Sequence, residues 1–325
     1  MKKVLITIFA CLLVLGVKVG ATDMVIDAKH QSFSESENKI KFKGDVVVSI
    51  DDMKVEGQSA DVSMTTKQEL DTATFYDKPY AYEIKKNKKR EVKANILKVS
   101  LITKVIKAEG DTQSIVFDGK TPIVVINADT QEYDSKTGIM EADGSVTIRY
   151  KEIETFSNHA TIKTDKNGDL KDLILIGNAR VKEQNNESFA DRFEYDPSTE
   201  ILTAKGNTTS NAIMDGGDKL VLKAVYQEYD RKQNIFNASG NVNVWYQDYY
   251  AVGPKITFYP DEKTGKPNEI YFNGRSSITQ GVRTIYADKI RMILDPKDFQ
   301  ATGNTRTVIK NIGSGNNEEG MSLGL

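Results

Sequence analysis

The chain has 325 residues, of which 39% are hydrophobic and 28% are charged, with a net charge of −2 and one cysteine. This balance argues against a nucleic-acid binder, which needs a strongly basic surface, and a single cysteine excludes an internal disulfide framework. Core burial and backbone pairing must stabilise the fold, and the length suffices for one long domain or two ordinary ones.

Residues 1–21 are predicted to be a cleavable signal peptide. Two lysines open the chain, the apolar stretch Val4–Val17 follows, and the small residues of Val19-Gly20-Ala21 precede a polar segment. An uncleaved anchor is the alternative, but this stretch is shorter than the ~20 residues that span a bilayer. Cleavage leaves an exported chain with 41 basic and 46 acidic side chains, a net charge of −5 and no cysteine.

The remaining chain repeats one pattern about every 33 residues, and the stretch Met140–Tyr150 shows it most clearly. Apolar side chains alternate with polar ones on both sides of a glycine, and this period of two predicts a strand with one dry face. A glycine that recurs so regularly suggests a fixed backbone requirement, such as a bulge or a tight bend. The pattern places this residue at nine positions, one of which is an aspartate: Gly44, Asp77, Gly110, Gly144, Gly177, Gly206, Gly240, Gly274 and Gly303.

A second element, alanine followed by aspartate or asparagine, lies about midway in many units. We expect these residues to start strands or form turns rather than to build a metal ladder, because they recur in several units. They are Ala60-Asp61, Ala94-Asn95, Ala128-Asp129, Ala190-Asp191 and Ala287-Asp288.

The predicted fold is all-β: a sandwich, a jelly roll or a solenoid, with almost no helix after the signal peptide. The turn at residues 165–169 divides the chain into modules 22–165 and 166–310, although the repeat runs through it, so one continuous body is equally compatible. Residues 311–325 lack alternation and are predicted to be a disordered tail.

Signs of catalysis are nearly absent from the sequence. His30 and His159 are far apart and lack the spacing of a metal pair, and no serine stands in a nucleophile-elbow context. We therefore predict a protein that is not an enzyme, with no catalytic residue, no bound metal and no cofactor.

Two polar or aromatic segments could contact a ligand. The first is a basic run that is either a solvated hairpin loop or a contact for phosphate groups on a ligand or membrane; its residues are Lys85, Lys86, Lys88, Lys89 and Arg90. The second is the aromatic stretch Trp245–Tyr250, for which strand packing is favoured over sugar or acyl contact.

The largest feature is the dry face itself, which either fills a closed core or lines an apolar groove. Both arrangements require the same alternation, so the pattern leaves them open. The candidate groove residues are Phe42, Val46, Val48, Ile50, Ile106, Met140, Val146, Ile148, Phe236, Val242, Val244, Ile270, Phe272, Ile278 and Phe299.

Three early segments resemble the LptA/OstA-like family of periplasmic lipopolysaccharide-transport proteins: Phe42–Val48, Gln58–Val62 and Leu70–Pro79. The last resembles a strand of that family that ends in a Gly-Lys-Pro turn, with Asp77 in place of the glycine. The later Ala-Asp and Gly-x-Val repeats are similar to the same domain continued, so the chain is about twice as long as one such domain.

The resemblance implies an elongated OstA-like β-jelly roll, of one long or two tandem modules, in the periplasm. It implies that lipopolysaccharide or a similar lipid binds with its acyl chains in the groove, and that the protein bridges the inner and outer membranes. Other jelly-roll transport components, or further copies end to end, would pair with edge strands, which we place near Ile40–Ile50 and Phe299–Ile309. A non-catalytic β-solenoid surface protein of the adhesin type is the alternative.

Overall fold

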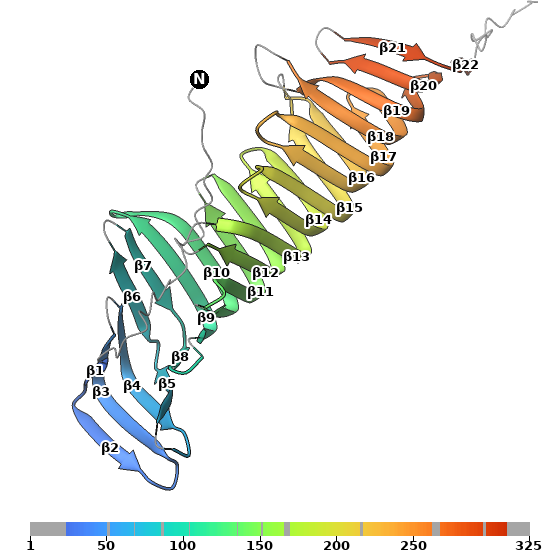
Figure 1. Ribbon diagram of the computed structural model, residues 1–325. Coiled ribbons are helices and arrows are strands. Elements are labelled where there is room, and N and C mark those ends of the chain that lie inside the picture. The colour runs from blue at the N-terminus through green and yellow to red at the C-terminus, as the bar shows by residue number, and fades with distance from the viewer. Residues whose placement is uncertain are drawn as a thin grey trace, which may run out of the picture. The chain divides into compact units, whose positions relative to one another are not determined.

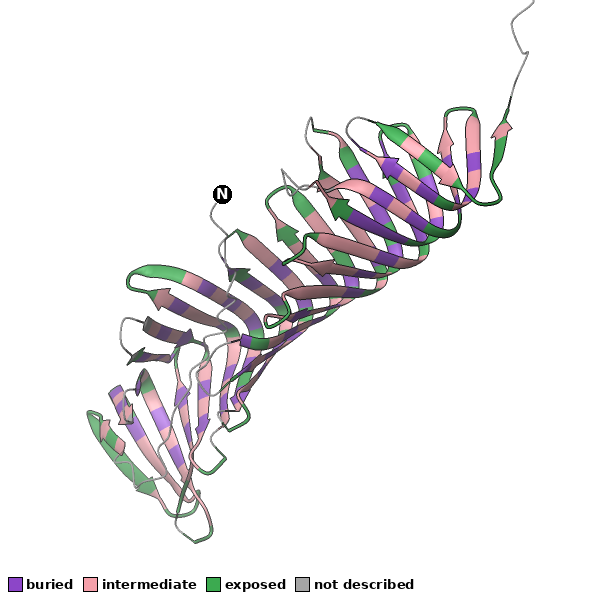
Figure 2. Cartoon of the chain, turned by 45° about the horizontal axis from the view of Figure 1, so that its top comes forward, coloured by how far each residue is buried: buried purple, intermediate pink, exposed green. Residues whose placement is uncertain are grey.

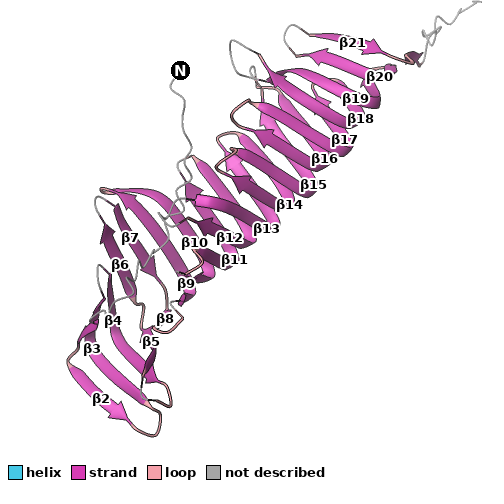
Figure 3. Cartoon of the chain, in the orientation of Figure 1, coloured by secondary structure: helices cyan, strands magenta, loops and turns pink. Residues whose placement is uncertain are grey.

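In a computed structural model, the described residues are 24–50, 53–67, 69–85, 88–103, 105–134, 136–150, 152–165, 170–214, 217–261, 267–294 and 297–310. The predicted signal peptide, 1–21, and the predicted tail, 311–325, lie outside these ranges. Throughout them, every regular element is a strand (Figure 3), which confirms the all-β prediction. No helix in the described residues is long and apolar enough to cross a membrane.

Most strands pair with the next one in the chain as antiparallel hairpins (Figure 1), whereas a few consecutive short strands both pair with the same neighbour. They are β1 (Met24–Asp27), β2 (His30–Ser34), β3 (Lys39–Ile50), β4 (Met53–Met64), β5 (Leu70–Tyr76), β6 (Tyr80–Lys85), β7 (Lys88–Lys93), β8 (Ile96–Ser100), β9 (Val105–Asp118), β10 (Thr121–Asp134), β11 (Ile139–Tyr150), β12 (Ile153–Thr164), β13 (Leu170–Glu183), β14 (Asn186–Asp196), β15 (Ile201–Ile213), β16 (Lys219–Asp230), β17 (Ile235–Tyr246), β18 (Tyr249–Pro260), β19 (Pro267–Gln280), β20 (Arg283–Ile293), β21 (Asp298–Thr302) and β22 (Arg306–Ile309).

The recurring glycine marks a corner in the middle of a long strand. In β11, pairing with β12 stops after Asp143 and resumes at Val146. The two residues between them, Gly144 and Ser145, have φ angles of 78° and 47°, in the left-handed region that glycine enters without strain. The same two-residue corner occurs at Gly44-Asp45, Gly110-Asp111, Gly177-Asn178, Gly206-Asn207, Gly240-Asn241 and Gly303-Asn304.

Four of the five Ala-Asp elements lie at these corners: three are in the middle of strands, and Ala94-Asn95 is at the break between β7 and β8. Ala60-Asp61 lies beyond the corner, regularly paired within β4. Ala94-Asn95 lies at a bend directly before β8, as expected, whereas the expectation of strand starts or turns was wrong for the elements within β4, β10, β14 and β20. At the four corner elements the alanine is buried while the next side chain covers the glycine of the neighbouring strand. This contact pairs Asn95 with Gly110, Asp129 with Gly144, Asp191 with Gly206 and Asp288 with Gly303.

Corners divide the long strands between two layers. Residues 112–118 of β9 pair with 121–128 of β10, whereas residues 105–109 of β9 pair with 130–134 of β10. We call the layer that contains 112–118 the first wall and the layer that contains 105–109 the second wall. The walls face each other, since the Ser114 hydroxyl on the first donates to Gln131 Oε1 on the second at 2.6 Å.

The chain forms two compact units, each with its own apolar core. The first comprises residues up to 210 together with 228–233, and the second comprises 211–227 and the residues from 234 onward. Within each unit, buried positions alternate with more exposed ones along the strands (Figure 2), as the period of two predicts. The predicted division into modules 22–165 and 166–310 rests on the sequence of residues 165–169, and it stays a prediction.

One predicted edge strand is wrong. β3, which contains Ile40–Ile50, pairs with β4 on one side and with β1 and β2 on the other, so β1 and β2 form the edge of the first unit. The other predicted edge agrees with the structure, because β21 and β22 pair with β20 and contain Phe299–Ile309.

Candidate functional site

The predicted dry-face residues gather in the interiors of the two units. In the first unit they belong to one buried cluster: Phe42, Val46, Val48, Ile106, Met140, Val146 and Ile148. In the second unit Val242, Val244, Ile270, Phe272 and Ile278 are buried, and Phe236 packs against them half-buried. Phe299 is half-buried on β21 with its ring centroid 5.3 Å from the Arg283 guanidinium, and the Ile50 side chain lies outside the described part.

The first unit has a corner side and an opposite side, which we call the mouth. Successive strands are connected at the mouth by two rows of turns. The turns at 118–121 and 183–186 and the strand ends at Tyr150 and Ile153 belong to the first wall, and the turn at 136–138 and the strand ends at Thr164 and Leu170 belong to the second. Covalent continuity between the walls therefore lies at the corners.

The apolar interior contains a buried ion pair that sequence reasoning missed. Glu83 on β6 is 2% exposed, and its Oε2 lies 3.5 Å from Nη1 of Arg90 on β7. Taking two charges out of water costs several kcal/mol per ion, and their attraction compensates only when the pairing is good. Two aliphatic side chains would fill this space without the cost of desolvating charges, so an ion pair here is unusual for an apolar core.

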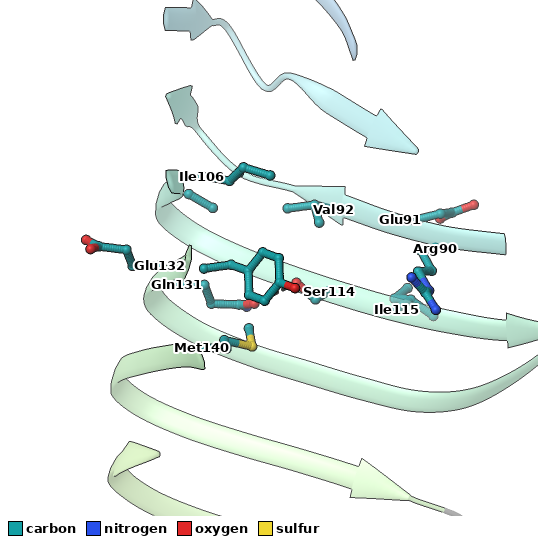
Figure 4. A pocket seen from close by; sticks show the side chains of 11 residues that line it. Arg90, Glu91, Val92, Ile106, Ser114, Ile115, Gln131, Glu132 and Met140 are labelled. Atoms are coloured by element: carbon teal, nitrogen blue, oxygen red, sulfur yellow. Dashed lines mark hydrogen bonds between the residues drawn. The ribbon is translucent and has the colours of Figure 1, made fainter. Parts of the chain in front are cut away.

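A small cavity lies beside this pair, between the two walls (Figure 4). Its volume of about 30 Å³ has room for roughly two water molecules. Arg90 and Ser114 line it from the first wall, and Gln131 and Tyr133 line it from the second. Burial raises the pKa of Tyr133, which keeps its hydroxyl a neutral donor.

Two neighbouring residues of the predicted basic run point in opposite directions. Arg90 points between the walls, whereas Lys89 lies on the outer face, where its Nζ donates to Tyr80 at 2.8 Å and pairs with Glu91 at 2.5 Å. The hydrogen bonds to Glu91 and Tyr80 raise the pKa of Lys89. The side chains of Lys85, Lys86 and Lys88 lie outside the described residues, and phosphate contact by this run stays a prediction.

Within the predicted aromatic stretch, Tyr246 is buried in the core of the second unit, whereas Trp245 and Tyr250 lie on the outer face. Trp245 and Tyr250 stack with their ring centroids 5.2 Å apart, both partly exposed. His159 bridges two carboxylates, with Nδ1 at 2.6 Å from Asp143 and Nε2 at 2.8 Å from Glu141. Within the described ranges, neither this cluster nor any other group of three such side chains is arranged to hold a metal ion.

Bent antiparallel strands around an apolar interior define the class of the protein: an all-β jelly roll whose main feature is a buried apolar surface. The sequence matches the family described as "LptA/(LptD N-terminal domain) LPS transport protein" over residues 25–119 and 125–266. The chain belongs to this family of lipopolysaccharide (LPS) transport proteins.

Among solved structures, one similar chain is LptH from Pseudomonas aeruginosa, described as the LptA-homologous periplasmic component of a lipopolysaccharide transport device. The two chains are 12% identical, with a TM-score of 0.33, and the match covers 38% of this chain and 83% of LptH. No curated protein matches the sequence.

Proposed function

We propose that this protein binds LPS in the periplasm, with the acyl chains between its walls and the sugars outside. The observation that carries the proposal is the buried apolar stripe of bent strands in a chain that belongs to an LPS transport family. The predicted groove residues supply this stripe, and their role as lipid contacts is part of the proposal.

The energetics of an acyl chain explain why such a carrier is needed. Moving a CH₂ group out of water is worth about 0.8 kcal/mol, so exposing one chain of about 12 to 14 carbons costs on the order of 10 kcal/mol. A lipid with several chains essentially never crosses water unaided. An apolar track with sites of similar energy would let it move under a modest push.

Lipid entry requires the walls to separate at the mouth. Covalent connections lie at the corners, so a lipid would replace side-chain contacts between the walls without breaking strand pairing within either wall. Acyl chains would then cover the same apolar surface that the opposite wall covers in the structure.

Bridging of the two membranes would use the edge strands. β1 and β2 end the first unit, β21 and β22 end the second, and each can accept a strand from a jelly-roll transport partner or another copy. An exported chain with this chemistry would act as a carrier rather than as an enzyme.

A structural repeat protein is the second candidate, and one observation favours it. Val46, Val242 and Ile270 are completely buried, as expected for a core that never opens. Native mass spectrometry of protein isolated from the cell envelope distinguishes the two. The carrier predicts a retained mass that matches a multi-acylated glycolipid, whereas protein that is consistently lipid-free would support the structural reading.

A further inference from the structure

An ion pair crosses the mouth of the first unit. Glu183 ends β13 in the first-wall row of turns. Arg231 follows β16, and its backbone amide donates to the Glu200 carbonyl at 3.2 Å, which ties it to the second-wall turn after β14. Arg231 Nη2 lies 3.4 Å from Glu183 Oε1, so this contact joins the two rows.

Arg231 is suited to exchange Glu183 for another anion. The side chain of Arg231 is 19% exposed and that of Glu183 is 40% exposed, so solvent screens their attraction. Partly exposed pairs at such distances contribute little to stability. An anion that offers Arg231 more hydrogen bonds can therefore displace the Glu183 carboxylate at small cost.

Beside the pair lies a second hydrogen-bond donor, and this one has no partner in the described part of the chain. Tyr195, on β14 in the second wall, is 4% exposed, and its hydroxyl has no hydrogen-bond partner among the described residues. Leaving a buried hydroxyl unpaired costs about 1–3 kcal/mol. Burial raises the pKa of Tyr195, partly offset by the nearby Arg231 guanidinium, so the hydroxyl stays a neutral donor. It remains ready to donate to an incoming acceptor.

We propose that Arg231 and Tyr195 bind a phosphate group of the glycolipid headgroup at the mouth, and that Glu183 occupies Arg231 until this phosphate displaces it. The proposal rests on the proposed function and specifies which part of the lipid is recognised there. Phosphate fits because it is anionic and has several acceptor oxygens, enough for a guanidinium and a hydroxyl together. A neutral sugar hydroxyl offers no charge to compete with Glu183.

The exchange couples recognition to opening. While Arg231 holds Glu183, the two rows of turns are linked; once Arg231 holds phosphate, that link is broken. A lipid without phosphate would have to separate the rows against the intact pair.

The test compares two lipids with identical acyl chains, bisphosphorylated lipid A and its dephosphorylated form, bound to the full exported chain. We expect tighter binding of the phosphorylated lipid by about tenfold, the effect of about 1.4 kcal/mol. Arg231→Gln should abolish the preference. Glu183→Gln should increase affinity for the phosphorylated lipid several-fold, because Arg231 loses its competitor. A loss of affinity for the phosphorylated lipid in Arg231→Gln, together with a gain in Glu183→Gln, distinguishes phosphate binding from a purely structural role of the pair.

Two further variants complete the design. Tyr195→Phe should weaken binding of the phosphorylated lipid without lowering the melting temperature, since its hydroxyl has no partner to lose. Arg149→Gln, in an exposed pair with Glu154 on the outer face, is the matched control and should change neither. Reduced affinity in Glu183→Gln, or an unchanged preference in Arg231→Gln, would overturn the inference.

The outcomes also separate this inference from the proposed function. Equal binding of both lipids by the wild type contradicts the phosphate site and leaves the lipid carrier standing, whereas binding of neither lipid contradicts both. Inorganic phosphate is the last arm: displacement of lipid at matched concentration would assign the site to free phosphate and overturn the headgroup proposal.

Discussion

Asp129 on β10 lies directly against Gly144 on β11, so close that a methyl group on the glycine would overlap the aspartate side chain. Gly144 also has a φ of 78°, which L-residues rarely adopt. The corner thus depends on a glycine for two independent reasons, its backbone conformation and the space that Asp129 fills. Gly206 with Asp191 and Gly303 with Asp288 repeat the arrangement.

Gly144→Ala should destabilise the fold through both effects. Strain in a left-handed alanine costs about 1–2 kcal/mol, and displacement of Asp129 should add at least about 1 kcal/mol. Urea unfolding measures the loss. The matched control is Gly119→Ala in the β9–β10 turn, where φ is 60° but no atom lies within 4 Å of the added carbon, so strain acts alone. Equal losses in the two variants would contradict the role of Asp129.

The buried pair of Glu83 and Arg90 should be more costly to break than to remove. Glu83→Gln leaves a buried guanidinium without its countercharge and should reduce the free energy of unfolding by about 3–5 kcal/mol. Replacing both, as Glu83→Leu with Arg90→Met, should cost much less. Urea unfolding of the single and double variants tests this, and a double variant worse than the single one would be the contrary result.

Acid should destabilise the turns of the second wall. Backbone amides of Lys136 and Thr137 donate to Asp134, the hydroxyl and amide of Ser198 donate to Asp196, and these bonds lower the pKa of each carboxyl below its usual 3.8. Because the folded pKa is the lower one, the contribution is fully present above about pH 4 and is lost as pH falls through the folded pKa.

Asp134→Asn keeps an acceptor oxygen but cannot titrate, so its stability should fall less steeply below pH 4 than that of the wild type. Adding Asp196→Asn should flatten the curve further. Unfolding free energies measured from pH 2.5 to 7 give the slopes, and parallel curves for all three proteins would rule out these two groups as the cause.

End-to-end assembly should depend on β22. Consecutive residues of an edge strand direct their amides to opposite sides, so Val308→Pro with Ile309→Pro removes one outward donor whatever the register. We expect oligomers seen by native mass spectrometry to shorten to monomers. A pair of alanines at the same positions is the control, and unchanged oligomer lengths in the proline variant would exclude pairing through this edge.

Sequence periodicity was sufficient to predict the long strands and the positions of most corners. Alternation identified which side chains enter the interior, and the spacing of Gly110, Gly144 and Gly177 indicated a backbone constraint that proved to be the corner. The role of Asp129 was missed, because nothing in a single strand shows what its neighbour places opposite. β1 and β2 were missed because they are short and largely polar, and their pairing with β3 depends on tertiary contacts.

The polar groups of the interior were harder to predict than its apolar ones. Arg90 stands in a basic run that suggests a solvated loop, yet its spacing of two from Val92 already places it on the dry face. Glu83 and Ala81 share a face in the same way. The pairing of Arg231 with Glu183 joins residues 48 positions apart and depends on how the turns approach at the mouth, which local alternation does not encode.

Photo-crosslinking in cells that make LPS shows whether lipid enters the interior of the protein. A photoreactive residue is placed at Val48, Ile148 or Val244, all buried in the interior, and at the matched outward neighbours Ser49, Arg149 or Asn243. If acyl chains enter between the walls, the interior positions should capture lipid and their neighbours should not. Equal labelling of the two sets, or none at the interior positions, would contradict lipid entry.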